Sequence, residues 1–147
     1  MKKFASPLLL ALGCIPFPAG FWMDRWMTAH PDQLFPYLPA GLVFLLVFFL
    51  VGFLGYRLTE STGKALLFLT LPGLLDLILL FIQEILLGRY WPGLPGAATQ
   101  MFYLPILNLG SRLDVLGHSL FSACLLSFFL TAAAACLGAE ICRKTDK

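Results

Sequence analysis

Three long, nearly uninterrupted apolar runs limit most strongly how this chain can fold. They extend from Pro39 to Tyr56, from Ala65 to Leu87 and from Leu116 to Gly138. Each is close to the length of about 20 residues that a helix needs to cross about 30 Å of hydrocarbon. A soluble domain carries roughly a quarter charged residues, whereas 12% of this chain is charged and 59% is apolar. We therefore expect an all-α integral membrane protein whose 147 residues form one domain.

A fourth segment, from Phe4 to Met23, is also long enough to span but contains three prolines, including Pro16 and Pro18. Proline removes a backbone donor, so a regular helix is not expected to pass through this segment. Its basic start is typical of a secretory signal, and "LALGC" is similar to a lipid-attachment sequence. However, Ala11 stands where a larger aliphatic residue is usual, and no small-residue cleavage site follows. We expect a retained, proline-broken first span, with a signal peptide or lipid anchor as the alternative.

The basic residues predict the orientation of this four-helix bundle. With four spans, the side of the N-terminus carries seven Lys and Arg residues and the other side carries three. The seven are Lys2, Lys3, Arg57, Lys64, Arg143, Lys144 and Lys147, and the three are Arg25, Arg89 and Arg112. Because cytoplasmic loops of membrane proteins are enriched in Lys and Arg, we expect both termini in the cytoplasm of a multi-pass cell-membrane protein.

The connections between the spans differ greatly in length. The sequence "RLTESTGK" predicts a tight cytoplasmic turn between the second and third spans, which makes those helices antiparallel neighbours. The outer loop from Arg89 to Val115 is much longer and is rich in Pro and Gly. Within it, "AATQMFYLPILNLG" is apolar but too short to span, so we expect an interfacial helix or a re-entrant segment.

Asp76 lies near the middle of the third span, where an ionisable residue is costly. Insertion scales give a cost of roughly 2.5–3.5 kcal/mol for an aspartate at the centre of a membrane helix. On a helical wheel, Gln83 lies about 20° and Glu84 about 80° from Asp76, so one polar edge extends from the midplane to the outer surface. We expect Asp76 to face protein or water, either as a functional site or as a structural hydrogen-bonding group. Glu84 is either part of that site or a charge at the interface.

The fourth span carries a ridge of small residues at four-residue spacing. The small-residue ridge consists of Ser119, Ala123, Ser127, Thr131 and Ala135. Small residues let helices approach closely in lipid, so we expect this ridge to pack against other helices and Phe128 to lie more toward lipid. If the ridge packs on the third span, Ser127 meets Asp76, since the two lie at the same depth. His118 lies at the depth of Glu84 and could exchange protons with it or simply form hydrogen bonds.

Composition and motifs exclude several classes of function. The net charge of +2 is small and scattered, which gives no case for nucleic-acid binding. The four cysteines form neither a CxxC pair nor a metal-ligand spacing, and nothing indicates a cofactor. No HExxH, GxSxG, paired-carboxylate or Cys-His arrangement has catalytic spacing, so an enzyme is the least supported class.

Two features coincide at one depth, namely Asp76 and the prolines of the first segment. Transporters often build midplane sites from broken helices. We therefore expect a small transporter or channel component in which Asp76 is a proton or cation site. Four short helices make a thin bundle, so we expect a homo-oligomer or a larger membrane-protein partner. The alternative is an accessory or assembly subunit that docks on a larger membrane protein and has no transport activity.

Overall fold

A computed structural model describes residues 5–114 and 119–145, and all regular elements within them are helical. The elements are α1 (Ala5–Gly13), α2 (Pro16–Ala29), α3 (Tyr37–Thr59), α4 (Thr62–Phe81), the π-helical turn η2 (Ile82–Leu86), α5 (Leu94–Leu113) and α6 (Leu120–Thr145). Four helical stretches are long and apolar enough to cross a membrane: Ala5–Ala29, Tyr37–Thr59, Thr62–Leu86 and Leu120–Thr145. The expected all-helical chain with four candidate spans is thus confirmed.

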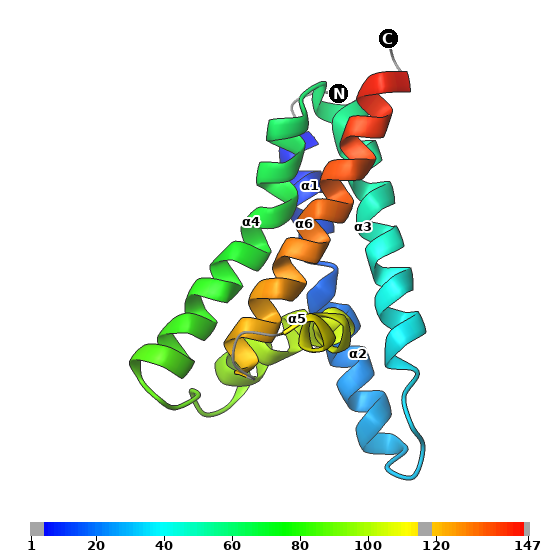
Figure 1. The fold of residues 1–147 in the computed structure, drawn as a ribbon. Coiled ribbons are helices and arrows are strands. Elements are labelled where there is room, and N and C mark those ends of the chain that lie inside the picture. The colour runs from blue at the N-terminus through cyan, green and yellow to red at the C-terminus, as the bar shows by residue number, and fades with distance from the viewer. Residues whose placement is uncertain (1–4, 115–118, 146–147) are drawn as a thin grey trace.

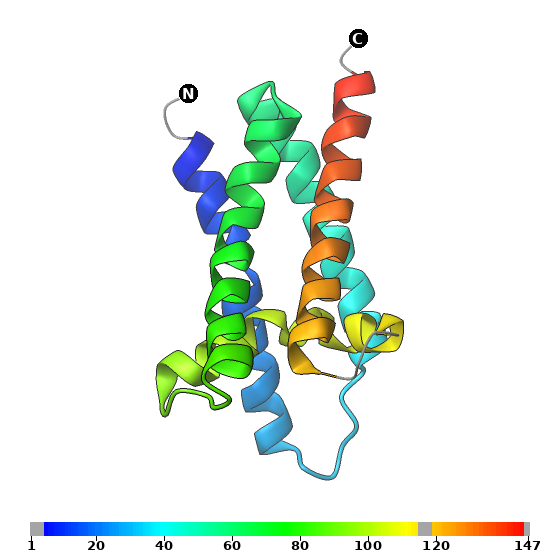
Figure 2. The same ribbon diagram turned by 60° about the vertical axis from the view of Figure 1, so that its left-hand side comes forward.

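The four candidate spans run side by side, and α1 begins at the same end of the bundle as α6 ends (Figures 1 and 2). We call this the terminal end, and the opposite end the loop end. The turn between α3 and α4 is also at the terminal end and is shorter than the sequence predicts. Glu60 ends α3 in a left-handed conformation with φ of 55°, and the side chain of Ser61 accepts a hydrogen bond from the backbone N–H of Lys64. A two-residue turn therefore makes α3 and α4 antiparallel neighbours.

The first candidate span is divided at Cys14 and Ile15, immediately before Pro16. The backbone N–H of Cys14 still bonds to the carbonyl of Leu10, whereas that of Ile15 bonds to the nearer carbonyl of Leu12. Pro16 has no N–H to continue the helical pattern, but it fits the first turn of a new helix. The chain accordingly ends α1 at Gly13 and starts α2 at Pro16.

The apolar segment of the long loop forms the middle of α5, which runs across the direction of the other helices (Figures 1 and 2). It packs against α2, α3, α4 and α6. Tyr103 and Ile106, in its middle, are almost fully buried. This helix therefore lies between the spans in the loop-end half of the bundle, rather than over them.

Glycines on the surrounding helices make room for α5. The Cα of Gly20 in α2 faces the backbone carbonyl of Met101 so closely that no side chain would fit between them. Gly73 in α4 leaves space for the rings of Phe102 and Tyr103, and the Tyr103 hydroxyl donates a hydrogen bond of 2.6 Å to the Gly73 carbonyl. The crossing helix is therefore seated by backbone contacts as well as by side chains.

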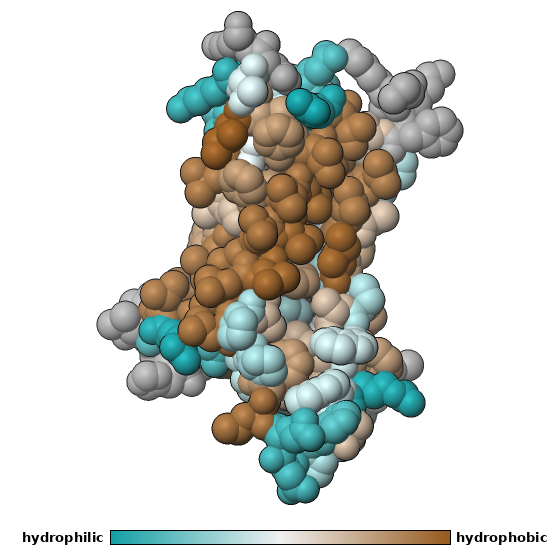
Figure 3. All heavy atoms as spheres, turned by 90° about the vertical axis from the view of Figure 1, so that its right-hand side faces the viewer, coloured by the Kyte–Doolittle hydropathy of each residue, from teal (hydrophilic) through white to brown (hydrophobic). Residues whose placement is uncertain are grey.

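The small-residue ridge of α6 is buried, apart from Ser119, which is half-buried. The part of the ridge nearer the terminal end packs on α3, where Gly52 lies against the backbone of Ala135. Phe128 was expected to lie more toward lipid than the ridge, and it is half-buried where the ridge residues of α6 are buried. Phe128 packs on the cluster around Leu77 and Tyr103, and the neighbouring Phe129 is the exposed ring. On the face drawn in Figure 3, a broad apolar surface separates two polar ends.

Candidate functional site

Asp76 lies on α4, where its half-buried side chain lines a groove of about 360 Å³. One wall of the groove is the break between α1 and α2, the other wall is α4, and Phe102 of α5 lies between them. We call it the flank groove, and its lining residues are Cys14, Phe17, Pro18, Pro72, Leu75, Asp76, Leu79 and Phe102. The structure thus brings Asp76 to the broken first segment, at Pro18 and Cys14.

The flank groove exists because the two halves of the first span pack on different helices. Before the break, α1 packs on α4; after it, α2 packs on α5. The two prolines that divide the first span therefore also separate α2 from α4. The space that remains between them is the groove, and the crossing helix α5 limits its depth.

The flank groove opens to the outside of the bundle. Phe17, Leu75 and Leu79 in its walls are 43%, 54% and 38% exposed, and Cys14 is exposed as well. The Oδ2 atom of Asp76 is buried and has no hydrogen-bond partner among the described residues. A carboxylate oxygen is thus held in an apolar, outward-opening groove without a donor.

Ser127 and Pro16 do not meet Asp76. The Ser127 hydroxyl is directed to the carbonyls of Ala123, at 2.8 Å, and of Ile106 in α5, at 3.4 Å. Pro16 faces a narrow central space of about 10 Å³, which Asp76 does not line. That volume is about the least that holds one water molecule. The central space therefore holds at most about one water molecule and does not border Asp76.

The outer part of the polar edge connects the end of α4 to the loop that follows it. Gln83 is fully buried, its side-chain oxygen accepts a hydrogen bond from the Trp91 N–H, and its Nε2 donates to the Thr99 hydroxyl. The Tyr90 hydroxyl donates to Glu84 at 3.1 Å. Burial, followed by this bond to Glu84, raises the pKa of Tyr90 to about 12. Gln83 and Glu84 thus hold the following loop in place, and neither residue lines the flank groove that contains Asp76.

His118 lies outside the described residues, so its expected relation to Glu84 stays a prediction. Within the described ranges, no group of three or more His, Cys, Asp or Glu residues could hold a metal ion.

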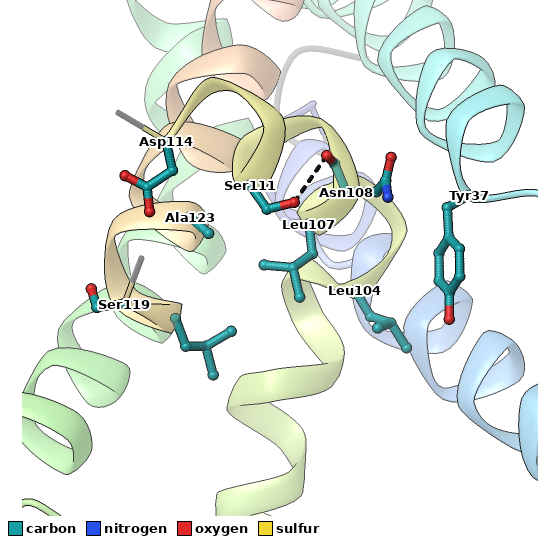
Figure 4. A pocket seen from close by; sticks show the side chains of 9 residues that line it. Tyr37, Leu104, Leu107, Asn108, Ser111, Asp114, Ser119 and Ala123 are labelled. Atoms are coloured by element: carbon teal, nitrogen blue, oxygen red, sulfur yellow. Dashed lines mark hydrogen bonds between the residues drawn. The ribbon is translucent and has the colours of Figure 1, made fainter. Parts of the chain in front are cut away.

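A second and larger cavity, of about 490 Å³, lies beside the C-terminal half of α5 (Figure 4). Its lining residues are Tyr37, Leu104, Leu107, Asn108, Ser111, Asp114, Ser119, Leu120 and Ala123. The hydroxyl of Ser111 donates to the carbonyl of Asn108, and Ser122 donates to Asp114. The sequence analysis missed this site, although Asn108 and Ser111 are polar residues in an apolar segment. Residues 115–118, which border it in the chain, are outside the described part.

Of the two sites, only the flank groove contains an intramembrane acid whose buried oxygen lacks a donor. No family model matches the chain, and no curated protein or solved structure matches it either.

Proposed function

We propose that this protein is an accessory subunit of a larger membrane assembly and that one transmembrane helix of another chain docks in the flank groove. The observation that carries the proposal is the position of Asp76, half-buried on the outside of the bundle with an unpartnered carboxylate oxygen. A proton or ion pathway would need water or protein groups around that carboxylate. A docking site needs it to face outward, as it does here.

The energetic argument for an occupant comes from the cost of leaving Asp76 unpaired. A buried acceptor without a donor costs about 1–3 kcal/mol. Acyl chains of lipids have no hydrogen-bond donor, so lipid in the groove cannot offset that cost. A second helix can, since polar side chains in membranes form hydrogen bonds across helix interfaces. Docking would also cover Leu75 and Phe17, which are exposed in the isolated chain.

A second copy of this chain is a poorer occupant than another protein. In the described part of the four spans, the exposed side chains near the middle are apolar except for the thiol of Cys14. The larger ones are Leu46, Leu50, Leu75, Ile78, Phe129 and Leu137. These apolar side chains have no donor and a thiol is a weak one, so a copy of this chain would be a poor hydrogen-bond partner for Asp76.

The proposal includes the orientation derived from the sequence. Four described basic residues, Arg57, Lys64, Arg143 and Lys144, lie at the terminal end, where α3 and α6 end and α4 begins. The excess of basic residues supports a cytoplasmic terminal end. The loop end, with α5, would then face the outside.

The transport hypothesis stays a prediction with one observation in its favour, which is that Asp76 lies beside a proline-broken helix. If Asp76 carries a transported proton or cation, Asp76→Asn abolishes a proton- or cation-dependent flux in proteoliposomes while the protein stays folded. Full flux in that variant, or no flux in the wild type, contradicts transport by this chain.

Site-specific photo-cross-linking in native membranes tests the docking proposal. A benzophenone amino acid is placed at Leu75 in the groove or at Leu50, which is similarly exposed on α3. We expect a protein adduct of one defined mass from position 75 and none from position 50. The adduct should disappear in Asp76→Leu and persist in the control Thr70→Val, which removes a half-buried hydroxyl of α4 outside the groove.

Three results would contradict the docking proposal. One is an adduct to lipid alone, and another is the same protein adduct from both positions. The third is an adduct with the mass of two copies of this chain, which would indicate a homo-oligomer. Far-UV circular dichroism of each purified variant in detergent confirms that the helices are retained.

A further inference from the structure

We infer that the docking helix carries a lysine or arginine at the depth of Asp76, so that assembly forms an ion pair inside the membrane. This inference rests on the proposed function, since it names the chemistry of the partner that occupies the flank groove.

The first support is the contrast between Asp76 and the other buried polar groups of the bundle. Ser127 and Thr131 donate to backbone carbonyls, and so does the hydroxyl of Tyr103. Gln83 makes two hydrogen bonds with its neutral amide. Where a carboxylate takes part in a contact between elements of this chain it has a donor, since Glu140 accepts from Thr62 and Asp114 accepts from Ser122. Two buried side-chain oxygens of the described residues lack a donor, Oδ2 of Asp76 and Oδ1 of Asn108, and of these two groups only Asp76 can carry a charge.

The second support is the position of the described basic residues. Four of them, Arg57, Lys64, Arg143 and Lys144, lie in the first or last turns of α3, α4 and α6 at the terminal end. The other three lie toward the loop end, Arg25 in α2, Arg89 in the loop before α5 and Arg112 in the last turn of α5. Arg143 is paired with Glu140 in the last turn of α6. None of these described cations lines the flank groove. The described part of this chain thus supplies no cation to Asp76, and we assign that cation to the docking helix.

The shape of the flank groove suits a long cationic side chain. Its walls near Asp76 are apolar, with Leu75, Leu79 and Phe17 on the two sides. Lysine and arginine have apolar stems that pack along such surfaces while the charged end reaches a polar partner. In a low-dielectric site an unpaired charge of either sign is costly, so a charged Asp76 there requires a cation beside it. Charge complementarity therefore selects a basic helix over one that offers only a hydroxyl or an amide.

The test measures the yield of the protein adduct from position 75 in four forms of the protein, with Asp, Glu, Asn or Leu at position 76. Asp76→Glu keeps the charge, and we expect it to retain at least half of the adduct. Asp76→Asn keeps the size and a hydrogen-bonding group but loses the charge, and we expect the yield to fall at least tenfold. An unchanged yield in Asp76→Asn would overturn the inference, since a neutral donor would then suffice.

A charge exchange completes the test once the adduct has identified the partner. Asp76→Lys should abolish the adduct, and replacing the partner's basic residue by aspartate should restore it. No restoration, or a partner helix without Lys or Arg at that depth, would overturn the inference while the docking proposal stands. The absence of any protein adduct from the wild type at position 75 would instead contradict the docking proposal itself. The two failures are therefore distinguishable.

Discussion

The close contact between α2 and α5 predicts that Gly20→Ala destabilises the protein. A Cβ atom at position 20 would lie 1.8 Å from the carbonyl oxygen of Met101, whereas an ordinary contact is 3.4 Å or more. The atoms nearest the new methyl are the backbone O, C and Cα of Met101, which belong to helix α5 and cannot rotate away. The two helices must therefore separate by more than an ångström, which also loosens the buried packing of Ile106.

The size of the effect follows from two opposing terms. Overpacking a close contact costs about 1–3 kcal/mol, and sometimes more. Replacing Gly by Ala inside a helix returns up to about 1 kcal/mol. Because the clash is with backbone, we place the first term near the top of its range and expect a net loss of about 2 kcal/mol. For a chain of this size that corresponds to a fall in melting temperature of about 4–8 °C.

Gly63→Ala is the matched control, because nothing lies within 4 Å of a Cβ atom at that position in α4. We expect it to be neutral or slightly stabilising. Thermal unfolding of both variants in the same detergent, followed by far-UV circular dichroism, gives the comparison. Equal melting temperatures for the two variants would refute the conclusion that α5 is seated directly on the backbone of α2.

Three other predictions concern separate parts of the molecule. Ser127→Leu should destabilise the bundle by about 1–3 kcal/mol, because it overpacks the contact between α6 and α5, and Ser127→Ala should cost less; unfolding in detergent measures both. The raised pKa of Tyr90, about 12 against an ordinary value of 10, means that its contribution to stability is complete below pH 10 and is lost as the pH rises through 12. Spectroscopic titration should show that Glu84→Gln lowers the ionisation midpoint of Tyr90, and an unchanged midpoint would argue against the bond between them. A cysteine at Thr145, in a variant without the exposed Cys14, should react with an impermeant maleimide only from the cytoplasmic side; labelling from outside would reverse the proposed topology.

The lengths of the spans could be predicted from the sequence because the thickness of the bilayer sets them. The apolar runs from Pro39 and Ala65 predict α3 and α4 to within a few residues at the start, since a helix with few charges is the only local solution in hydrocarbon. The break before Pro16 follows from the missing N–H of proline. Local chemistry alone was sufficient for these features.

Several other features depend on which helices become neighbours, and a helical wheel does not contain that information. The wheel predicted a polar edge from Asp76 to Gln83 and Glu84, but those two residues lie in the π-helical turn η2, and the wheel could not distinguish the flank groove from the side that faces Ser127. It also could not show that Phe128 packs against α4 and α5, which supply the neighbours of that half-buried ring.

The position of the crossing helix α5 explains most of the difference between the surroundings predicted from the helical wheel and those in the structure. Its segment was predicted as apolar and too short to span, but its position between the spans depends on close backbone contacts at Gly20 and Gly73. A glycine permits such an approach without specifying its partner, so only the tertiary structure shows which helices meet there. Because α5 occupies the middle of the loop-end half, Ser127 faces α5, and Asp76 lies in a groove on the outside of the bundle.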